Sequence, residues 1–364
     1  MPGVLYVGLQ DADKIAVFSI DDAGKLAGQG EVAAPGGPSV MAVSNDRRML
    51  YVGQRDVGQR DVGQRDVGQR GGPAIASFRI DARSGALSAA GSAAQPHAPT
   101  FLAPDRSGRF MLVAYYQGGG AAVFRLGADG TVGAASQDWL ATATGAHAIA
   151  TDRSNRFAYV PHIARVQDNV LEPPKNISGP NVIMQFRFDA ETGRLSANTP
   201  PQVAQPDLVG PRHYCFHPSR DIVYFSNEQG CSVTAYRIAA DGALAPLQTI
   251  STLPAGFAGR NTCSQIHLTP SGRFLYVGNR GHNSIAGFAV APDTGALTLA
   301  GHVPTEPVPS AFCLDPGGRF LFAAGTASGR LASYRVDGER GTLTPLAVQD
   351  VGHRPAAVAA VGLG

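Results

Sequence analysis

Short runs of aromatic and branched aliphatic residues alternate along the chain with clusters of Gly, Pro, Asn and Asp. Runs of this kind, punctuated by turn-forming residues, are typical of hairpins in antiparallel sheets. In the best-defined stretch the pattern predicts four consecutive strands joined by turns, over residues 264–268, 273–278, 284–290 and 297–302. This stretch is therefore predicted to form one four-stranded antiparallel unit.

The same unit recurs along the chain. Each copy continues from an apolar strand to a second strand and then to a turn of the type DAETGRL or AADGAL. Complete copies align on the apolar residue that follows a polar turn, at Met49, Phe110, Phe157, Ile222, Phe274 and Phe320. A four-stranded repeat of roughly 45–50 residues is the signature of a β-propeller.

The two ends of the chain supply complementary parts of one more unit. Residues 5–26 carry its back half, and residues 354–361 carry its front half. Pairing the last strand with the first closes the ring and leaves no sheet edge open. We therefore predict an all-β protein in which residues 1–364 form a single domain, a seven-bladed β-propeller with one blade closed by N- and C-terminal strands.

Two segments interrupt the repeat. One holds three tandem copies of DVGQR at about residues 56–70, which account for the extra length of that repeat relative to the last one. The other spans residues 163–181, where Pro-Pro and Gly-Pro pairs argue against helix or strand. We expect both to be loops on the same face of the ring, and the second to cover a binding site.

Composition narrows the classes of function. Charged residues make up 16% of the chain and the formal net charge is +2, with no basic stripe for a nucleic acid. No apolar run reaches the roughly 20 residues that a membrane span needs, and the first residues lack the pattern of a signal peptide. We expect a cytoplasmic protein, a monomer or weak homo-oligomer, with no nucleic-acid or membrane partner.

The cysteines show no spacing typical of a metal or redox motif. They are Cys215, Cys231, Cys263 and Cys313, and they fall in predicted strands or at strand ends. A thiol in such a place usually serves as a small apolar side chain, so we expect inert reduced cysteines. No three candidate ligands show zinc-site spacing on a rigid element, and we expect neither a metal nor a cofactor.

Blade topology sorts the polar residues by face. In a propeller the first strand of a blade lies at the channel and the fourth at the rim, so the segments before first strands and those between second and third strands share one face. A mouth lined by His, Arg, Glu, Asn and Tyr is suited to binding or catalysis. The residues on that face are Tyr116, His147, His162, Arg212, His213, Asn227, Glu228, Asn279 and Arg280.

Three segments carry a resemblance to a known family. GPRHYCFHPSRDIVYFSNEQGCSVTAYRI, IHLTPSGRFLYVGNRGHNSIAGFAV and PTEPVPSAFCLDPGGRFLFAAG look like bacterial propeller-type 6-phosphogluconolactonases and the related fungal 3-carboxy-cis,cis-muconate cyclases. The resemblance implies a metal-free enzyme that opens or forms a lactone. It also implies that His147, Arg212, Glu228 and Arg280 are the catalytic residues. The other five polar residues of that face are candidates for substrate binding.

The chain departs from this family at three places. Gln265 stands where many relatives have an acidic residue, Ser310 where they often have Arg, and Thr326 follows Gly325 where they often have Asn-Gln. A phosphate is usually held by several cationic or bidentate donors. The missing arginine therefore weakens the case for a phosphorylated substrate.

Lactone hydrolysis needs a base to activate water, donors for the oxyanion and an acid for the leaving alkoxide. His147 and Glu228 can share the base and acid roles, while Arg212 and Arg280 hold the oxyanion or an anionic group of the substrate. We expect a metal-independent lactonase acting on an anionic sugar-derived or carboxylated lactone, and we expect alanine substitutions of these four residues to lower activity with little change in stability.

Other interpretations remain open at this point. The same four residues suit the reverse reaction of a cycloisomerase, and a propeller can be a non-catalytic binding module, because a fold alone does not define a function. In a purely structural interpretation, His147 is a satisfied residue at a strand end and the Arg and Glu residues form surface salt bridges.

Overall fold

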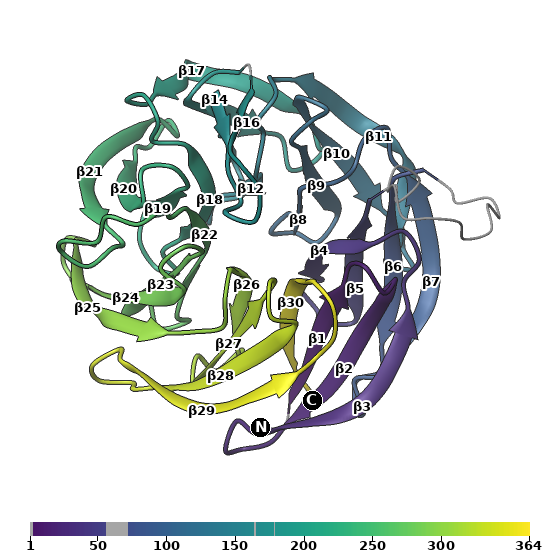
Figure 1. The fold of residues 1–364 in the computed structure, drawn as a ribbon. Helices are drawn as coiled ribbons and strands as arrows, with labels where there is room; N and C mark the ends of the chain where they lie inside the picture. Colours follow the sequence, from purple (N-terminus) through teal and green to yellow (C-terminus); the bar gives the residue numbers. More distant parts are fainter. Residues whose placement is uncertain (1–2, 56–71, 164, 178) are drawn as a thin grey trace.

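The computed structural model describes residues 3–55, 72–163, 165–177 and 179–364. In this part of the chain, seven four-stranded antiparallel sheets stand around a central axis, as Figure 1 shows. The prediction of an all-β seven-bladed propeller is confirmed. The predicted DVGQR insertion at residues 56–70 lies outside the described residues.

Most blades are built from strands that follow one another from the channel to the rim. These blades are β4 (Pro38–Val43), β5 (Met49–Gln54), β6 (Ala74–Ile80) and β7 (Leu87–Ala94); β8 (Phe101–Pro104), β9 (Phe110–Tyr115), β10 (Gly120–Leu126) and β11 (Val132–Ala141); β12 (Ala150–Thr151), β13 (Phe157–Pro161), β16 (Val182–Phe188) and β17 (Leu195–Ala204); β18 (Pro211–Phe216), β19 (Ile222–Asn227), β20 (Ser232–Ile238) and β21 (Leu244–Ser251); β22 (Cys263–Leu268), β23 (Phe274–Asn279), β24 (Ser284–Val290) and β25 (Leu297–Pro304); and β26 (Pro309–Leu314), β27 (Phe320–Gly325), β28 (Arg330–Val336) and β29 (Leu343–Asp350). In the blade predicted in detail, β24 has the expected bounds, β22 and β25 differ by one and two residues at one end, and β23 is shifted by one residue.

The remaining blade joins the two ends of the chain. It consists of β30 (Pro355–Gly362), β1 (Gly3–Leu9), β2 (Lys14–Ile20) and β3 (Leu26–Ala33). β1 pairs antiparallel with β30, with Val7 opposite Val358, and the marked termini lie near each other in Figure 1. This pairing is the predicted closure of the ring.

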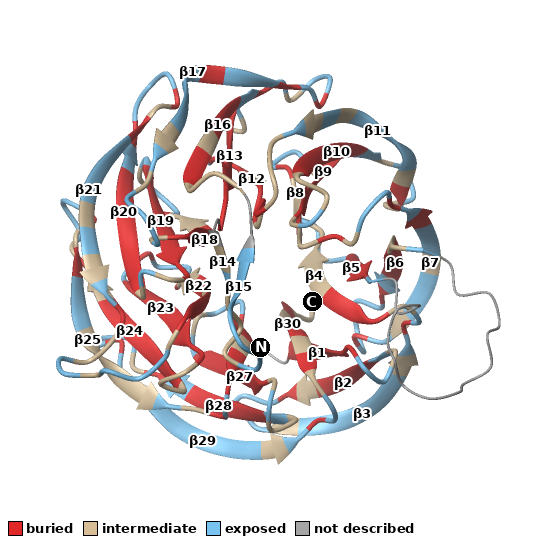
Figure 2. Ribbon diagram, turned by 45° about the horizontal axis from the view of Figure 1, so that its top comes forward, coloured by how far each residue is buried: buried red, intermediate tan, exposed pale blue. Residues whose placement is uncertain are grey.

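Burial explains why the second strand of a blade is mostly apolar on both of its faces instead of alternating. Every residue of β5, β9, β19, β23 and β27 is buried, because both faces of a blade pack against its neighbours. Outer strands such as β3 and β29 are mostly exposed. Figure 2 shows the same division, with buried inner strands and an exposed rim.

A glycine in the outer turn of each blade fits against the preceding blade. Every one of these glycines has a positive φ, and a Cβ atom built on it would lie 2.1 to 2.9 Å from an apolar side chain near the start of the neighbouring second strand. The pairs are Gly24 with Phe320, Gly85 with Val4, Gly130 with Met49, Gly193 with Phe110, Gly242 with Phe157, Gly295 with Ile222 and Gly341 with Phe274. Most of these apolar residues are the ones on which the sequence repeat aligns.

Tyrosine hydroxyls reinforce this contact. The donors are Tyr6, Tyr51, Tyr159, Tyr224 and Tyr276, and each bonds the carbonyl of the adjacent turn glycine at 2.6 to 2.9 Å. Because the tyrosine and the glycine belong to neighbouring blades, the bond fixes one blade against the next.

The insertion between β13 and β16 contains regular structure. β14 (Arg165–Gln167) pairs antiparallel with β15 (Lys175–Ile177). The expectation that this segment lacks strands is therefore wrong. Pro173 and Pro174 precede β15 instead of lying inside it, so the backbone groups of both short strands are available for pairing.

Gly242→Ala should destabilise the protein more than Gly256→Ala. The two glycines have nearly equal φ values of 84° and 82°, so both variants carry the cost of a left-handed alanine, roughly 1–2 kcal/mol. At Gly242 the new methyl would lie 2.2 Å from Phe157, whereas at Gly256 the described structure places nothing within 4 Å. Overpacking should add about 1–3 kcal/mol at Gly242 alone. Equal losses in urea denaturation would contradict this account of the blade contact.

Candidate functional site

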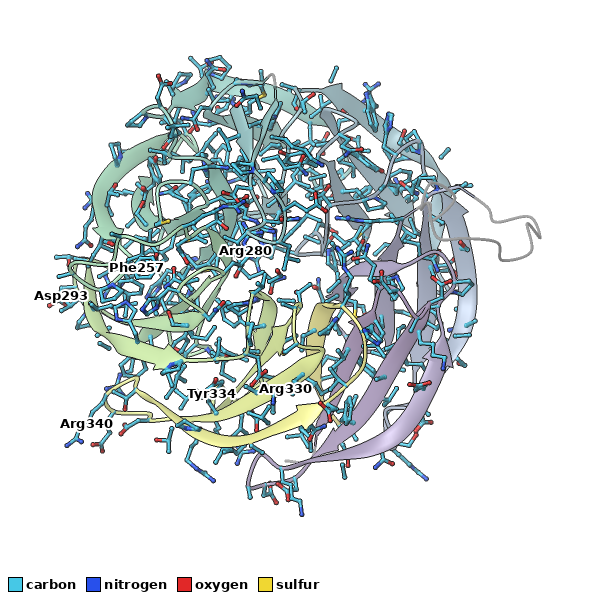
Figure 3. The ribbon with its side chains drawn as sticks, in the orientation of Figure 1. Phe257, Arg280, Asp293, Arg330, Tyr334 and Arg340 are labelled. Carbon is cyan, nitrogen blue, oxygen red and sulfur yellow. The ribbon has the colours of Figure 1, made fainter. Side chains whose placement is uncertain are left out.

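A cavity of about 600 Å³ lies at the centre of the ring. Its walls come from segments that precede first strands, from the beginnings of those strands, and from segments that join second to third strands, which is the face predicted from topology. Arg280, one of its lining residues, lies near the middle of the ring in Figure 3, whereas Asp293 and Arg340 lie at the rim.

The structure brings the four candidate catalytic residues together. His147 comes from the segment before β12, Arg212 from the start of β18, and Glu228 and Arg280 from the residues that follow β19 and β23. All four line the cavity. Of the candidate substrate-binding residues, Tyr116 and His213 line it as well.

The other candidates lie within the blades and do not line the cavity. His162 is fully buried, and its ring nitrogens contact the Val160 carbonyl at 3.1 Å and the Thr142 hydroxyl at 3.0 Å. The side-chain amides of Asn227 and Asn279 donate to hydroxyl and carbonyl groups of adjacent segments. These polar groups hold loops to strands, and the structure does not bring the three residues to the cavity. Their predicted role in substrate binding stays a prediction.

An ionic cluster forms one wall of the cavity. Glu228 Oε2 accepts from Arg212 Nε at 2.7 Å and lies 3.0 Å from Arg280 Nη2. The three side chains are at most 11% exposed, so these are not surface salt bridges. Burial, opposed by the Glu228 carboxylate, lowers the pKa of Arg212 to about 10, and Arg212 is therefore a cation at neutral pH. One carboxylate thus lies between two guanidiniums.

Three aromatic rings form the neighbouring wall. The His147 ring lies 5.7 Å from that of Tyr116 and 5.0 Å from that of His213, centroid to centroid. Burial, aided by the nearby Arg212, lowers the pKa of both histidines well below the usual value of 6.5. Both imidazoles are therefore neutral at pH 7. Burial raises the pKa of Tyr116, so its hydroxyl stays protonated.

Several buried polar atoms at this cavity lack a hydrogen-bond partner among the described residues. They are His147 Nδ1, His213 Nε2, Arg212 Nη1, Arg280 Nε and the Tyr116 hydroxyl. Most buried polar groups in proteins are paired, and an unpaired one costs about 1–3 kcal/mol. Their concentration around one cavity indicates a site that a ligand completes. The structural interpretation of His147 as a satisfied residue does not fit its Nδ1 atom.

The 163–181 insertion contributes to the same cavity. Its lining residues include Gln167, Asp168 and Leu171. The Asp168 carbonyl accepts from Arg280 Nη2 at 3.2 Å, and the Asp168 carboxylate pairs with Arg260. The insertion therefore lies at the site, as topology led us to expect. Asp168 is a lining residue that the sequence reasoning missed, because no repeat position marks it.

The residues that depart from the family pattern also face the cavity. Gln265, Ser310 and Thr326 all line it, and so do Arg55 and Arg354. The described lining thus holds four arginines against two acidic residues. This balance gives the cavity a positive potential and favours an anionic ligand.

Neither a metal cluster nor a membrane helix is found in the described part of the chain. No group of three or more His, Cys, Asp or Glu side chains there could hold a metal ion. No helix among the described residues combines the length and apolar character needed to cross a membrane.

A family profile, curated relatives and a solved structure all match this chain, and each is described as a lactonase. A family profile described as "Lactonase, 7-bladed beta-propeller" matches residues 4–360. A 6-phosphogluconolactonase of Pectobacterium carotovorum is 34% identical over 86% of this chain and 84% of its own length, and that of Yersinia pestis is 33% identical over the same shares. The structure of a periplasmic gluconolactonase of Pseudomonas aeruginosa matches over 100% of both chains, with a TM-score of 0.86 and 26% identity.

Glu228→Gln should destabilise the protein by about 3–5 kcal/mol, because it leaves two buried guanidiniums without their carboxylate. The sequence led us to expect little change in stability, and the burial of the cluster reverses that expectation. Glu31→Gln is the matched control: Glu31 is 47% exposed and pairs with Lys14 at 2.6 Å, so its loss should cost less than about 1 kcal/mol. Similar losses for both variants in chemical denaturation would show that the cluster is not a buried ion pair in solution.

Proposed function

Because the chain belongs to the family of seven-bladed β-propeller lactonases, we propose that it hydrolyses the ester bond of an anionic lactone derived from a sugar acid. One observation carries the proposal: a neutral imidazole and two guanidiniums with unpaired nitrogen atoms line the same cavity. Ester hydrolysis needs a proton acceptor for the attacking water and donors for the oxyanion, and these groups can supply both.

His147 is the proposed base. Its neutral ring can take a proton from a water molecule as that water attacks the carbonyl carbon of the lactone. The imidazolium then donates the proton to the ring oxygen as the C–O bond breaks, which gives a hydroxy acid. The positive charge of Arg212, which lowers the pKa of His147, makes the protonated ring a stronger acid for this second step.

Arg212 and Arg280 are the proposed oxyanion donors. Arg212 Nη1 and Arg280 Nε are buried and have no hydrogen-bond partner among the described residues, so each guanidinium keeps an unused donor that we assign to the carbonyl oxygen as it gains charge. Glu228 bonds both guanidiniums through one oxygen. We therefore assign it as a positioning residue, since fixed donors need no reorganisation during the reaction.

The substrate class follows from the charge and size of the cavity. Four lining arginines and two acidic residues favour an anion, and about 600 Å³ is within the usual range of small-molecule sites. A carboxylate or phosphate on the lactone would meet this positive charge. Ser310, Gln265 and Thr326 line the same cavity, so they are placed to influence which lactone of this class is preferred.

A panel of lactones tests the proposal. Purified protein should hydrolyse phosphorylated or carboxylated sugar lactones faster than neutral gluconolactone, and a chelator should not change the rate. Absence of hydrolysis above the spontaneous rate for every lactone would overturn the proposal. Conversion of 3-carboxy-cis,cis-muconate to its lactone would instead identify a cycloisomerase.

The acid limb of kcat/KM on the best lactone should lie well below pH 6.5. The base works in its neutral form, and burial together with Arg212 lowers the pKa of His147 below that value, so activity persists as the pH falls until the lowered pKa is reached. His147→Ala should reduce kcat/KM about 10²-fold or more and abolish that limb. His217→Gln is the control, because the His217 ring accepts a turn hydrogen bond from Ser219 and does not line the cavity. An acid limb near pH 6.5, or one that survives in His147→Ala, would refute the assignment of the base.

Replacing residues 165–180 by a short Gly-Ser turn should raise KM or change the preferred lactone while the fold survives. The replacement removes lining residues and the carbonyl that holds Arg280. Deletion of residues 56–70, a segment of similar length, is the control and should change neither property, since loop length costs little entropy. Unaltered kinetics across the panel for the 165–180 replacement would show that the insertion takes no part in substrate selection.

A further inference from the structure

Two of the cysteines lie against each other behind the ionic cluster. Cys231 and Cys263 are within thiol hydrogen-bonding reach and pack in the same apolar cluster. Cys263 is fully buried, whereas Cys231 is partly exposed. Both are free thiols, as the sequence led us to expect, and segments of neighbouring blades converge here.

Neighbouring polar groups hold the two sulfur atoms in place. The Thr252 hydroxyl lies 3.2 Å from Cys263 Sγ and donates to the Cys231 carbonyl at 2.9 Å. Asn261 contacts Cys231 Sγ through both its side-chain amide, at 3.3 Å, and its carbonyl, at 3.2 Å. The pair is therefore part of an ordered network and does not depend on one contact.

The same pair is bonded to the proposed oxyanion site. The Cys263 backbone N–H donates to the Glu228 carbonyl at 2.9 Å, and the Cys263 carbonyl accepts from Arg280 Nη2 at 3.1 Å. Cys231 follows Glu228 in the turn after β19 and has a φ of 45°, a conformation that residues other than glycine seldom adopt. A displacement of either cysteine therefore moves Glu228 or Arg280.

We propose that Cys231 and Cys263 form a site of oxidative modification, at which a peroxide converts the two thiols to a disulfide and thereby weakens the neighbouring lactonase site. The second half of this statement rests on the proposed function. The first half concerns the thiols alone and is tested without any lactone.

The two cysteines are suited to different steps. The hydrogen bond from Cys263, together with Asn261 and Arg280, lowers the pKa of Cys231, while burial raises the pKa of Cys263. The Cys231 thiolate attacks one peroxide oxygen, the O–O bond breaks, and hydroxide leaves to give a sulfenic acid. The Cys263 sulfur then attacks the Cys231 sulfur, the S–O bond breaks, and water leaves. The two thiols lose two electrons and two protons in all, and one hydrogen peroxide becomes two waters.

A disulfide shortens the separation of the two sulfurs to roughly 2.05 Å, and it requires a particular torsion about the S–S bond. We expect this change to shift the turn that carries Glu228 relative to the start of β22, and so to disturb the contacts of the Cys263 backbone with Glu228 and Arg280. Displacements of about 1 Å at a catalytic site cost on the order of 10²-fold in rate. We expect a loss of kcat/KM of about that size.

Peptide mapping tests the modification directly. Cleavage after Arg220, Arg237, Arg260 and Arg273 places Cys231 and Cys263 in separate tryptic peptides. Protein treated with hydrogen peroxide and digested without reduction should give one cross-linked species of these two peptides, lighter than their sum by two hydrogen atoms, and dithiothreitol should separate them. If the two peptides remain uncrosslinked, the proposal is wrong.

Variants separate the steps. Cys263→Ser should accumulate a sulfenic acid on Cys231 that dimedone traps, whereas Cys231→Ser should give neither adduct nor cross-link and should keep its activity in peroxide. The double variant Cys215→Ser/Cys313→Ser keeps the pair and should behave like the unmodified chain. Trapping on Cys263 in place of Cys231 would overturn the assigned order of attack.

Lactonase activity tests whether the disulfide weakens the neighbouring site. Peroxide should lower kcat/KM on the best lactone about 10²-fold, and dithiothreitol should restore it. A cross-link with unchanged kcat/KM would overturn the coupling to the site. If the reduced protein hydrolyses no lactone at all, the proposed function fails, and the peptide map still decides whether the disulfide forms.

Discussion

The contact between a turn glycine and the start of the neighbouring second strand is the constraint on which the rest of this structure depends. It recurs from blade to blade, and the pair Gly24 and Phe320 continues it across the junction of the chain ends. A side chain at the glycine would force the blades apart, and the positive φ excludes most other residues there in any case. Blade spacing is thus set at the outer turns, far from the cavity.

This arrangement leaves the centre of the ring free for chemistry. Strand ends that point toward the axis need no apolar side chains to hold the blades together, because the packing between blades lies farther out. The cavity can therefore hold buried charges and unpaired nitrogen atoms. The apolar clusters between blades offset the unfavourable free energy of burying these groups. Polar residues that lower stability where they stand are a common feature of functional sites.

The sequence was sufficient for the fold because the repeat is defined by short-range patterns. The residues on which it aligns are the partners of the turn glycines, so the alignment detected a real contact between blades. The sequence also predicted correctly the face of the ring on which Glu228 and Arg280 lie. It did not show that these two side chains line the cavity whereas those of their immediate neighbours, Asn227 and Asn279, do not. Side chains alternate sides at the end of a strand, and the choice between cavity and blade interior depends on register.

Two kinds of feature could not be predicted from the sequence: a hairpin inside an insertion, and contacts between segments far apart in the chain. The β14–β15 hairpin depends on where the Pro-Pro and Gly-Pro pairs fall relative to the pairing backbone groups, and no repeat position marks it. The contact of Asp168 with Arg280, and that of Cys231 with Cys263, each join segments of different blades. Such contacts are set by how the blades are placed around the axis, which local pattern does not encode.

The pairing of β1 with β30 has a consequence for synthesis of the protein on the ribosome. β1 emerges before β30 and the six other blades lie between them in the chain, so the inner edge of β1 has no partner while those blades are made. At the usual rate of about 5–20 residues per second, that delay lasts tens of seconds. Throughout it, the nascent chain presents an apolar strand with unpaired backbone groups, the kind of surface that chaperones bind and that neighbouring nascent chains can pair with.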